Sequence, residues 1–166
     1  MSRRSEDRRL TTVIREVSVD LVAYLRRRVG PDDAADLFSE TMLVAWRRVG
    51  DLPADPERAR MWLFGIARGT LLNHARGEQR RRALGERLRA YLQQEDTTAG
   101  PDAGLEVRDA LNRLDPDSAE LIRLVHWERM TLAEAAELLT IPASTARSRY
   151  MRARETLRVQ LGSTVN

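Results

Sequence analysis

Apolar residues recur at spacings of three and four over residues 5–29, which is the pattern of an amphipathic helix. Gly30 and Pro31 interrupt the pattern, because this dipeptide favours a turn. A second apolar stripe follows over residues 32–49, and Trp46 is assigned to its buried side. We therefore predict two helices that are separated at Gly30 and Pro31.

A polar segment with two prolines, residues 50–60, separates this pair from the next apolar pattern. The pattern begins at Pro56 or Glu57 and continues to Arg76 or beyond, with Leu72 on the side that is assigned to the core. The first half of the chain is therefore predicted to be a bundle of three helices with one exposed loop.

The second half has shorter apolar stretches with clear helix boundaries. One helix is predicted from Leu105 to Leu114, and Asp115 with Pro116 has the pattern of a cap and first position of the next helix. Thr131 and Glu134 have the spacing of a capping box, in which side chains satisfy backbone N–H groups at a helix start.

The last two predicted helices form a helix-turn-helix. The first ends at Thr140, and Pro142 favours the opening of a second helix, for which Ser144 or Thr145 is the predicted cap. This second helix carries five arginines but one acidic residue, Glu155. Such a helix is suited to the DNA major groove, although an ordinary helical hairpin with a solvated basic face has the same pattern.

Composition supports an all-α fold with two small helical domains and a flexible acidic linker. Residues 90–107 contain four acidic residues and no basic residue, and residues 90–104 lose hydrophobicity while gaining Thr, Gly, Pro and Asp. The predicted domains are therefore residues 5–89 and 105–162, joined by residues 90–104.

Charge distribution points to nucleic acid. All 28 basic residues are arginine, and residues 58–89 contain nine of them against Glu78 and Glu86. A basic helix surface of this kind can follow a phosphate backbone, and a solvated basic tail is the plainer interpretation.

Other classes of protein lack support in the sequence. There is no cysteine, no catalytic or phosphate-binding motif and no second ligand near His74 or His126 at a metal-binding spacing, so neither an enzyme nor a metal or cofactor site is expected. No apolar run reaches the roughly 20 residues that span a bilayer, which predicts a cytoplasmic protein without membrane insertion.

Together, residues 10–161 resemble the bacterial sigma factors of the extracytoplasmic-function (ECF) group. The resemblance to their second domain lies in residues 32–49 (DDAADLFSETMLVAWRRV) and 60–82, and the resemblance to their fourth domain lies in residues 110–139 and 141–158. It implies a promoter-specificity subunit that binds core RNA polymerase, at its clamp helices and flap, and promoter DNA. It also implies an anti-sigma factor as a partner.

The resemblance implies roles for three sets of residues, and it places an unstacked base of the minus-ten element in the loop at residues 50–60. The first set would contact the polymerase clamp helices, the second would hold the melted minus-ten strand and the third would face the minus-thirty-five duplex. These sets are, in that order, Asp33, Asp36, Ser39 and Glu40; Arg58, Arg60, Arg68, Asn73 and Arg76; and Thr145, Arg147, Ser148, Met151 and Arg152. Solvation and the helix dipole are an equally simple explanation of the acidic residues.

The chain departs from the pattern of the family at several positions. The family commonly has Glu at Ala35, Asn at Gly69, Asp at Asn73, Gly at Thr140, and Gly and Val at Ser144 and Ala146. Gly69 bears on the contacts with the minus-ten strand. Thr140 bears on the helix-turn-helix, because a side chain is strained in a left-handed turn.

Two further hypotheses compete with the sigma factor. A stand-alone regulator would bind DNA through the helix-turn-helix only, with the first half as an interaction domain. A scaffold of two helical bundles would not bind DNA, and replacing Arg147 and Arg152 would leave its activity intact.

Overall fold

The computed structural model describes residues 3–92 and 105–162, and the residues it describes contain helices but no strand. The chain divides into two compact units, Met1–Glu95 and Asp96–Asn166, here called unit 1 and unit 2. The all-α prediction is therefore confirmed for the described residues. Most of the predicted linker, residues 93–104, lies outside them.

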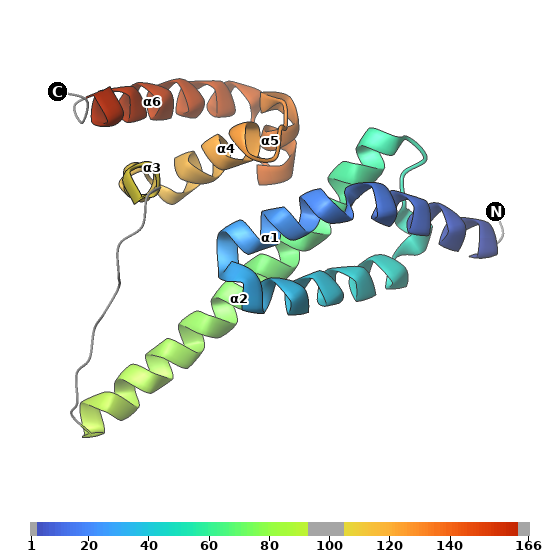
Figure 1. Ribbon diagram of the computed structural model, residues 1–166, viewed down its shortest axis with the longest axis horizontal. Coiled ribbons are helices and arrows are strands. Elements are labelled where there is room, and N and C mark those ends of the chain that lie inside the picture. Colours follow the sequence, from blue (N-terminus) through green and yellow to red (C-terminus); the bar gives the residue numbers. More distant parts are fainter. Residues whose placement is uncertain (1–2, 93–104, 163–166) are drawn as a thin grey trace. The chain divides into compact units, whose positions relative to one another are not determined.

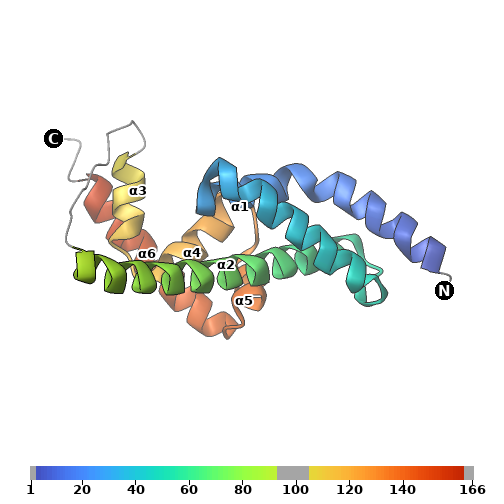
Figure 2. The same ribbon diagram turned by 90° about the horizontal axis from the view of Figure 1, so that it is seen from below.

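Unit 1 begins with α1, Arg3–Arg47, which consists of two helical arms that meet at Gly30 (Figures 1 and 2). Gly30 has φ 84° and ψ 174°, a conformation that is essentially restricted to glycine. Pro31 follows as the start of the second arm. The predicted interruption between two helices is therefore confirmed, and it takes the form of a sharp kink.

A short 3-10 helix, η1 (Val49–Asp51), and a loop lead into α2, Pro56–Leu92. The backbone N–H of Arg58 donates to Oδ1 of Asp55 over 2.9 Å, so Asp55 caps the start of α2. The helix continues three residues into the segment that the sequence assigned to the linker. In both views its C-terminal part extends beyond the arms of α1 (Figures 1 and 2).

The core of unit 1 is built from facing positions of the two arms and α2. Tyr24 and Phe64 are fully buried, and their rings meet edge to face with centroids 5.2 Å apart. The hydroxyls of Thr41 and Thr70 lie 3.1 Å apart between α1 and α2, and each also bonds to a carbonyl of its own helix. Burial of these polar groups is tolerated because they have partners.

Between residues 105 and 162, unit 2 contains four helices: α3 (Leu105–Asn112), α4 (Pro116–His126), α5 (Leu132–Leu139) and α6 (Ala143–Gly162). Asp115 caps α4 by accepting the N–H of Ser118 over 3.0 Å, and Pro116 takes the first position. Thr131 and Glu134 form a complete capping box at the start of α5. Both predicted caps are confirmed.

In the turn between α5 and α6, a residue other than glycine adopts the left-handed backbone conformation. Thr140 has φ 57° and ψ 42°, and its N–H bonds to the carbonyls of Ala136 and Glu137. The predicted cap of α6 is wrong, because that helix begins at Ala143 and places Ser144 and Thr145 in its first turn. The N–H of Ala146 donates to the carbonyl of Pro142, so the helical hydrogen bonds start earlier than expected.

The core of unit 2 forms where α6 lies against the other helices. Leu111, Ile122 and Ala153 are buried together, and four half-buried side chains pack around them: Leu114, Trp127, Tyr150 and Leu157. Ala146 and Ala153 are two helical turns apart and almost fully buried. They fix which face of α6 is inside and which face is left to solvent.

Candidate nucleic-acid interface

The exposed face of α6 carries the residues that the sequence predicted for duplex recognition. Arg147, Ser148, Met151 and Arg152 are all exposed, and they lie on the side of the helix away from Ala146 and Ala153. Met151 is 64% exposed, so its apolar side chain is accessible on this face. The structure therefore brings these four residues together on one surface.

Local hydrogen bonds shape this surface. Ser148 donates its hydroxyl to the carbonyl of Thr145 over 3.1 Å, and Arg152 donates Nε to the carbonyl of Ser148 over 3.3 Å. The half-buried Thr145 thus lies at the edge of the surface. The guanidinium of Arg152 is held along the helix, with further N–H groups left to reach a phosphate or a base edge.

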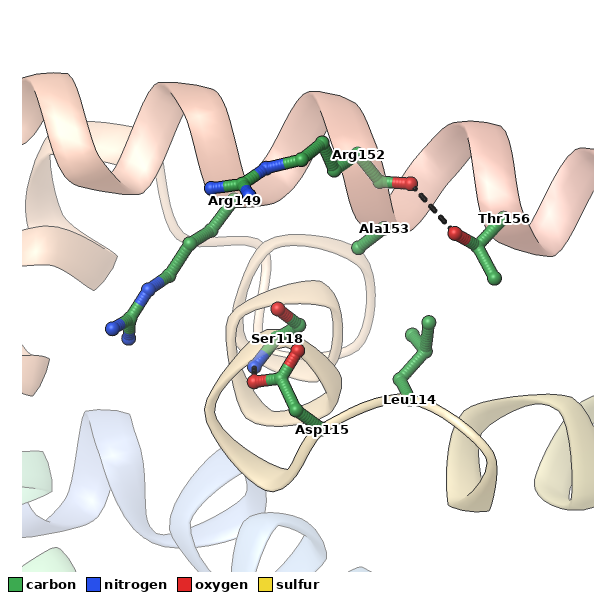
Figure 3. A pocket seen from close by; sticks show the side chains of 7 residues that line it. All are labelled: Leu114, Asp115, Ser118, Arg149, Arg152, Ala153 and Thr156. Carbon is green, nitrogen blue, oxygen red and sulfur yellow. Dashed lines mark hydrogen bonds between the residues drawn. The ribbon is translucent and has the colours of Figure 1, made fainter.

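Arg149 takes a different role from its neighbours. Its Nη1 lies 3.0 Å from Oδ2 of Asp117, which joins α6 to α4. Beside this pair is a cavity of about 350 Å³, lined by Leu114, Asp115, Ser118, Arg149, Arg152, Ala153 and Thr156 (Figure 3). The sequence did not single out Arg149, because its acidic partner is 32 residues away.

Asp115 is held in its charged form at the edge of this cavity. Hydrogen bonds from the Ser118 side chain and backbone lower the pKa of the Asp115 carboxyl. In Figure 3 the two residues face one another at the start of α4. Because Arg149 already pairs with Asp117, Arg152 is the exposed arginine beside this cavity that suits an anion.

A second surface of unit 2 is apolar. It is a groove of about 530 Å³ whose walls come from α3, α4 and α6. Val107 is 47% exposed there, and Met151 lies on the border between the groove and the arginine surface. His126 also lines it, with Nε2 3.0 Å from the hydroxyl of Tyr150, so this histidine has a partner in the protein.

On α2, three of the four predicted arginines share one face of the helix. Arg58, Arg68 and Arg76 lie within about a quarter turn of one another around the helix axis. Arg60 is nearer the core, with its guanidinium 4.9 Å from the centre of the Phe64 ring. Asn73 is exposed at the other edge of the same face. Arg58, Arg68, Asn73 and Arg76 therefore form a band, here called the arginine band, and the structure does not bring Arg60 into it.

Gly69 lies within this band. A Cβ built at Gly69 would have no heavy atom within 4 Å, so no packing constraint requires glycine there. The next turn carries Leu72, which was assigned to the core but is 42% exposed. That assignment is wrong because Leu72 follows the fully packed Leu71 by one position and points away from both arms of α1.

The loop before α2 is short and held at both ends. Leu52 is only 7% exposed, and its N–H bonds to the carbonyl of Val49. Ala54 is exposed at the outer part of the loop. The centre of the loop between these two fixed ends is therefore open to a ligand.

The acidic residues occupy the second arm of α1. Asp36, Ser39 and Glu40 are exposed on one face, and Leu43, one turn further, is 57% exposed between them and Trp46. Trp46 was assigned to the core and is 40% exposed, so that assignment is wrong. Helical spacing from Asp36 and Glu40 could have identified Leu43 as part of this face.

Asp33 lies at the edge of the acidic face and contacts α2. Its Oδ2 is 3.6 Å from Nε2 of His74, which directly follows Asn73 in the arginine band. His74 was expected to be a structural or surface residue. The structure places it between the two helices that carry the acidic and the basic surfaces.

Some arginines on these helices are already paired with acids. Hydrogen bonding to Arg81 lowers the pKa of Glu78, and hydrogen bonding to Arg158 lowers the pKa of Glu155, while Glu155 raises the pKa of Arg158. These pairs are fully exposed, so they contribute little to stability. They do reduce the local positive charge at the C-terminal parts of the two surfaces.

Within 3–92 and 105–162, no group of three acidic, histidine or cysteine side chains could hold a metal ion. No helix in those ranges is long and apolar enough to cross a bilayer.

Two family models match the chain, one in each unit. Residues 13–81 match Sigma-70 region 2, and residues 104–157 match Sigma-70, region 4. The first match covers both arms of α1, the loop and most of α2. The second covers the helix-turn-helix.

Named relatives extend the similarity over most of the chain. The ECF RNA polymerase sigma factor SigC of Mycobacterium tuberculosis is 34% identical over 140 residues, which is 82% of this chain and 72% of SigC. The RNA polymerase sigma factor NccH of Alcaligenes xylosoxydans xylosoxydans is 32% identical over 147 residues, covering 81% of this chain and 76% of NccH.

Solved structures share the fold. CnrH, solved in complex with the cytosolic domain of CnrY, has a TM-score of 0.64 and 25% identity, covering 95% of this chain and 90% of that one. RpoE from Bartonella quintana, solved with the anti-sigma factor NepR, has a TM-score of 0.62 and 24% identity, covering 89% and 95%. Because both sigma regions match, a stand-alone regulator that uses unit 2 alone is set aside, and so is a scaffold without DNA binding. The chain belongs to the ECF RNA polymerase sigma factors, and it is a promoter-specificity factor of transcription initiation.

Proposed function

We propose that the three surfaces divide the work of promoter recognition between them. The acidic face of α1 contacts the clamp helices of core polymerase, the arginine band of α2 holds the melted minus-ten strand, and the exposed face of α6 reads the minus-thirty-five duplex. Unit 1 and unit 2 are thus the second and fourth sigma domains, and residues 93–104 connect them. The protein acts by binding, in the cytoplasm where polymerase and promoter are found.

The exposure of both arginine surfaces is the observation that carries this proposal. Arg147 and Arg152 on α6, like Arg58 and Arg76 on α2, point away from the cores of their units. Neutralising phosphates releases counterions, which gives such surfaces affinity for DNA regardless of sequence. Sequence reading then comes from the side chains near base edges, and an arginine bound to guanine through two hydrogen bonds contributes roughly 1–3 kcal/mol of discrimination.

The acidic face suits a protein partner better than solvent alone. Leu43 lies one turn beyond Glu40, so an exposed apolar side chain borders the carboxylates. Interfaces commonly combine an apolar centre with a polar rim. We assign Leu43 and Trp46 to the polymerase contact together with Asp33, Asp36, Ser39 and Glu40.

Reconstitution tests the whole proposal. Purified protein is combined with core polymerase and genomic DNA, and the 5′ ends of the transcripts are sequenced. We expect starts at a set of promoters that share two elements at constant spacing. Random starts, or no stimulation over core polymerase alone, would refute the proposal.

We also propose that a protein partner occupies the apolar groove of unit 2. CnrH is solved with the cytosolic domain of CnrY, and here the groove combines an exposed Val107 with Met151 of the duplex-reading surface. An anti-sigma factor seated there would cover Met151 and compete with DNA. A Val107→Glu variant should raise promoter output in cells while leaving reconstituted transcription unchanged, and unchanged output in cells would contradict the groove assignment.

A further inference from the structure

Arg9 makes a long-range contact with the loop before α2. Its Nη2 donates to the carbonyl oxygen of Pro53 over 2.7 Å, although the two residues are 44 positions apart, and the contact is partly buried. Arg9 lies on the first arm of α1, next to the fully buried Leu10. The loop is thereby tied to a rigid part of unit 1.

The rest of the loop is held only at its ends. Leu52 is buried on one side, and Asp55 caps α2 on the other. Beside the intervening residues is an open hollow of about 310 Å³, lined by Arg8, Arg9, Thr12, Val13, Glu16, Pro53, Ala54, Pro56 and Ala59. Since side chains do not fill this space, packing alone leaves the middle of the loop free to shift.

We propose that Arg9 is a positioning residue for base recognition in the minus-ten strand. This inference rests on the proposed function, and on the expectation from the family resemblance that the loop at residues 50–60 receives an unstacked base of the minus-ten strand. Pulling a base out of its stack costs a few kcal/mol, and a preformed pocket recovers that cost better than a mobile one. The bond from Arg9 fixes Pro53, and thereby the exposed Ala54, in one position.

Arg8 provides a matched control. It is the preceding residue, it lines the same hollow, and it is exposed. Arg8→Ala and Arg9→Ala each remove one positive charge from the same helical turn. A difference between them therefore reports the hydrogen bond to Pro53 rather than the general electrostatic attraction for DNA.

The experiment measures base preference in the holoenzyme. Full-length protein is assembled with core polymerase and allowed to bind single-stranded oligonucleotides with a randomised window, and the bound pool is sequenced. We expect Arg9→Ala to lose about tenfold in preference at one position of the window, as loss of a charged hydrogen bond would give. Arg8→Ala should keep the wild-type preferences, and Arg9→Lys, which keeps the charge and a donor, should be intermediate.

The outcomes separate this inference from the proposed function. If the wild-type holoenzyme shows no base preference, the proposed function fails. If the wild type is selective and Arg9→Ala keeps the same preferences, or binds all sequences more weakly by an equal factor, the positioning role is refuted. If thermal unfolding shows that Arg9→Ala does not fold, the test uses Arg9→Lys instead. A base preference in Arg9→Lys equal to that of the wild type would then refute the positioning role.

Discussion

Single residues set the shape of the helix-turn-helix, and Thr140 is the clearest case. A β-branched residue holds the left-handed position that glycine adopts without strain. The family commonly has glycine there. The turn has kept its geometry because two backbone carbonyls, of Ala136 and Glu137, receive the Thr140 N–H.

We expect Thr140→Gly to stabilise unit 2 by about 1 kcal/mol, because the left-handed conformation costs a residue with a Cβ roughly that much. Thermal or denaturant unfolding of the full chain measures the change. Thr140→Ala is the control, since it keeps a Cβ at the strained position and should give a smaller gain. A lower stability of Thr140→Gly would show that the threonine side chain makes a stabilising contact.

Asp115 controls the start of α4. Asp115→Ala should destabilise the chain by about 1 kcal/mol through loss of the cap, whereas Asp115→Asn should retain most of the stability because asparagine caps equally well. Hydrogen bonds from Ser118 lower the pKa of Asp115 in the folded chain. The contribution of the ionised form is therefore complete above the ordinary pKa of about 4 and is lost as the pH falls through the lowered value.

Unfolding measured as a function of pH checks this. The stability difference between wild type and Asp115→Asn should shrink as the solution is acidified below pH ~4. A difference that grows on acidification would mean that the carboxylate is not the stabilising form.

At the scale of elements, α1 depends on one glycine for its reversal. Gly30→Ala should destabilise unit 1 by roughly 1–3 kcal/mol, because its backbone conformation is almost closed to other residues. No atom lies within 4 Å of the Cβ position, so the loss would come from the backbone alone. Circular dichroism during urea unfolding would measure it.

Gly69→Ala is the matched control with the opposite sign. Its Cβ position is also open, but the residue lies inside α2, where alanine is preferred to glycine by about 1 kcal/mol. If Gly30→Ala and Gly69→Ala changed the free energy of unfolding equally, the kink at Gly30 would not require glycine.

If the exposed face of α6 contacts phosphates, the affinity for duplex DNA should depend on the salt concentration. The slope of log K against log [salt] should fall by about 1 for each phosphate-contacting arginine that is removed. We expect Arg147→Ala with Arg152→Ala to lower both slope and affinity in holoenzyme–promoter binding. Arg158→Ala is the control, because that arginine already pairs with Glu155. If Arg158→Ala lowered the salt slope and the affinity as much as the double variant does, the overall positive charge of the helix would explain DNA binding, and a defined contact surface would not.

At the scale of the whole molecule, polymerase binding and DNA binding should be separable. Asp36→Lys with Glu40→Lys should weaken assembly with core polymerase at least tenfold, since the introduced charges repel where the original ones attract. Gel filtration or fluorescence anisotropy with labelled protein measures this without DNA. Asp20→Lys, on the exposed surface of the first arm, is the control and should leave assembly unchanged.

Local patterns in the sequence were enough to predict most elements but not the contacts between them. The capping box at Thr131, the cap at Asp115 and the break at Gly30 depend on neighbouring residues, and all three are confirmed. The exposure of Trp46 and Leu72 was not predictable, because apolar character alone does not say which positions a neighbouring helix covers. The bonds from Arg9 to Pro53 and from Arg149 to Asp117 join residues that only the tertiary fold brings together.

The contact between Asp33 and His74 has a consequence for promoter geometry. It joins the arm that bears the carboxylates to the helix that bears the arginines, and the buried Thr41 and Thr70 meet between the same two segments. Under the proposed function, unit 1 would fix a distance. With the carboxylates bound to the polymerase, the width of the helical bundle would set the offset at which the separated strand is held. The position of the transcription start site would then depend on the distance from the polymerase surface. Substitutions that change the packing between these helices would shift the start site.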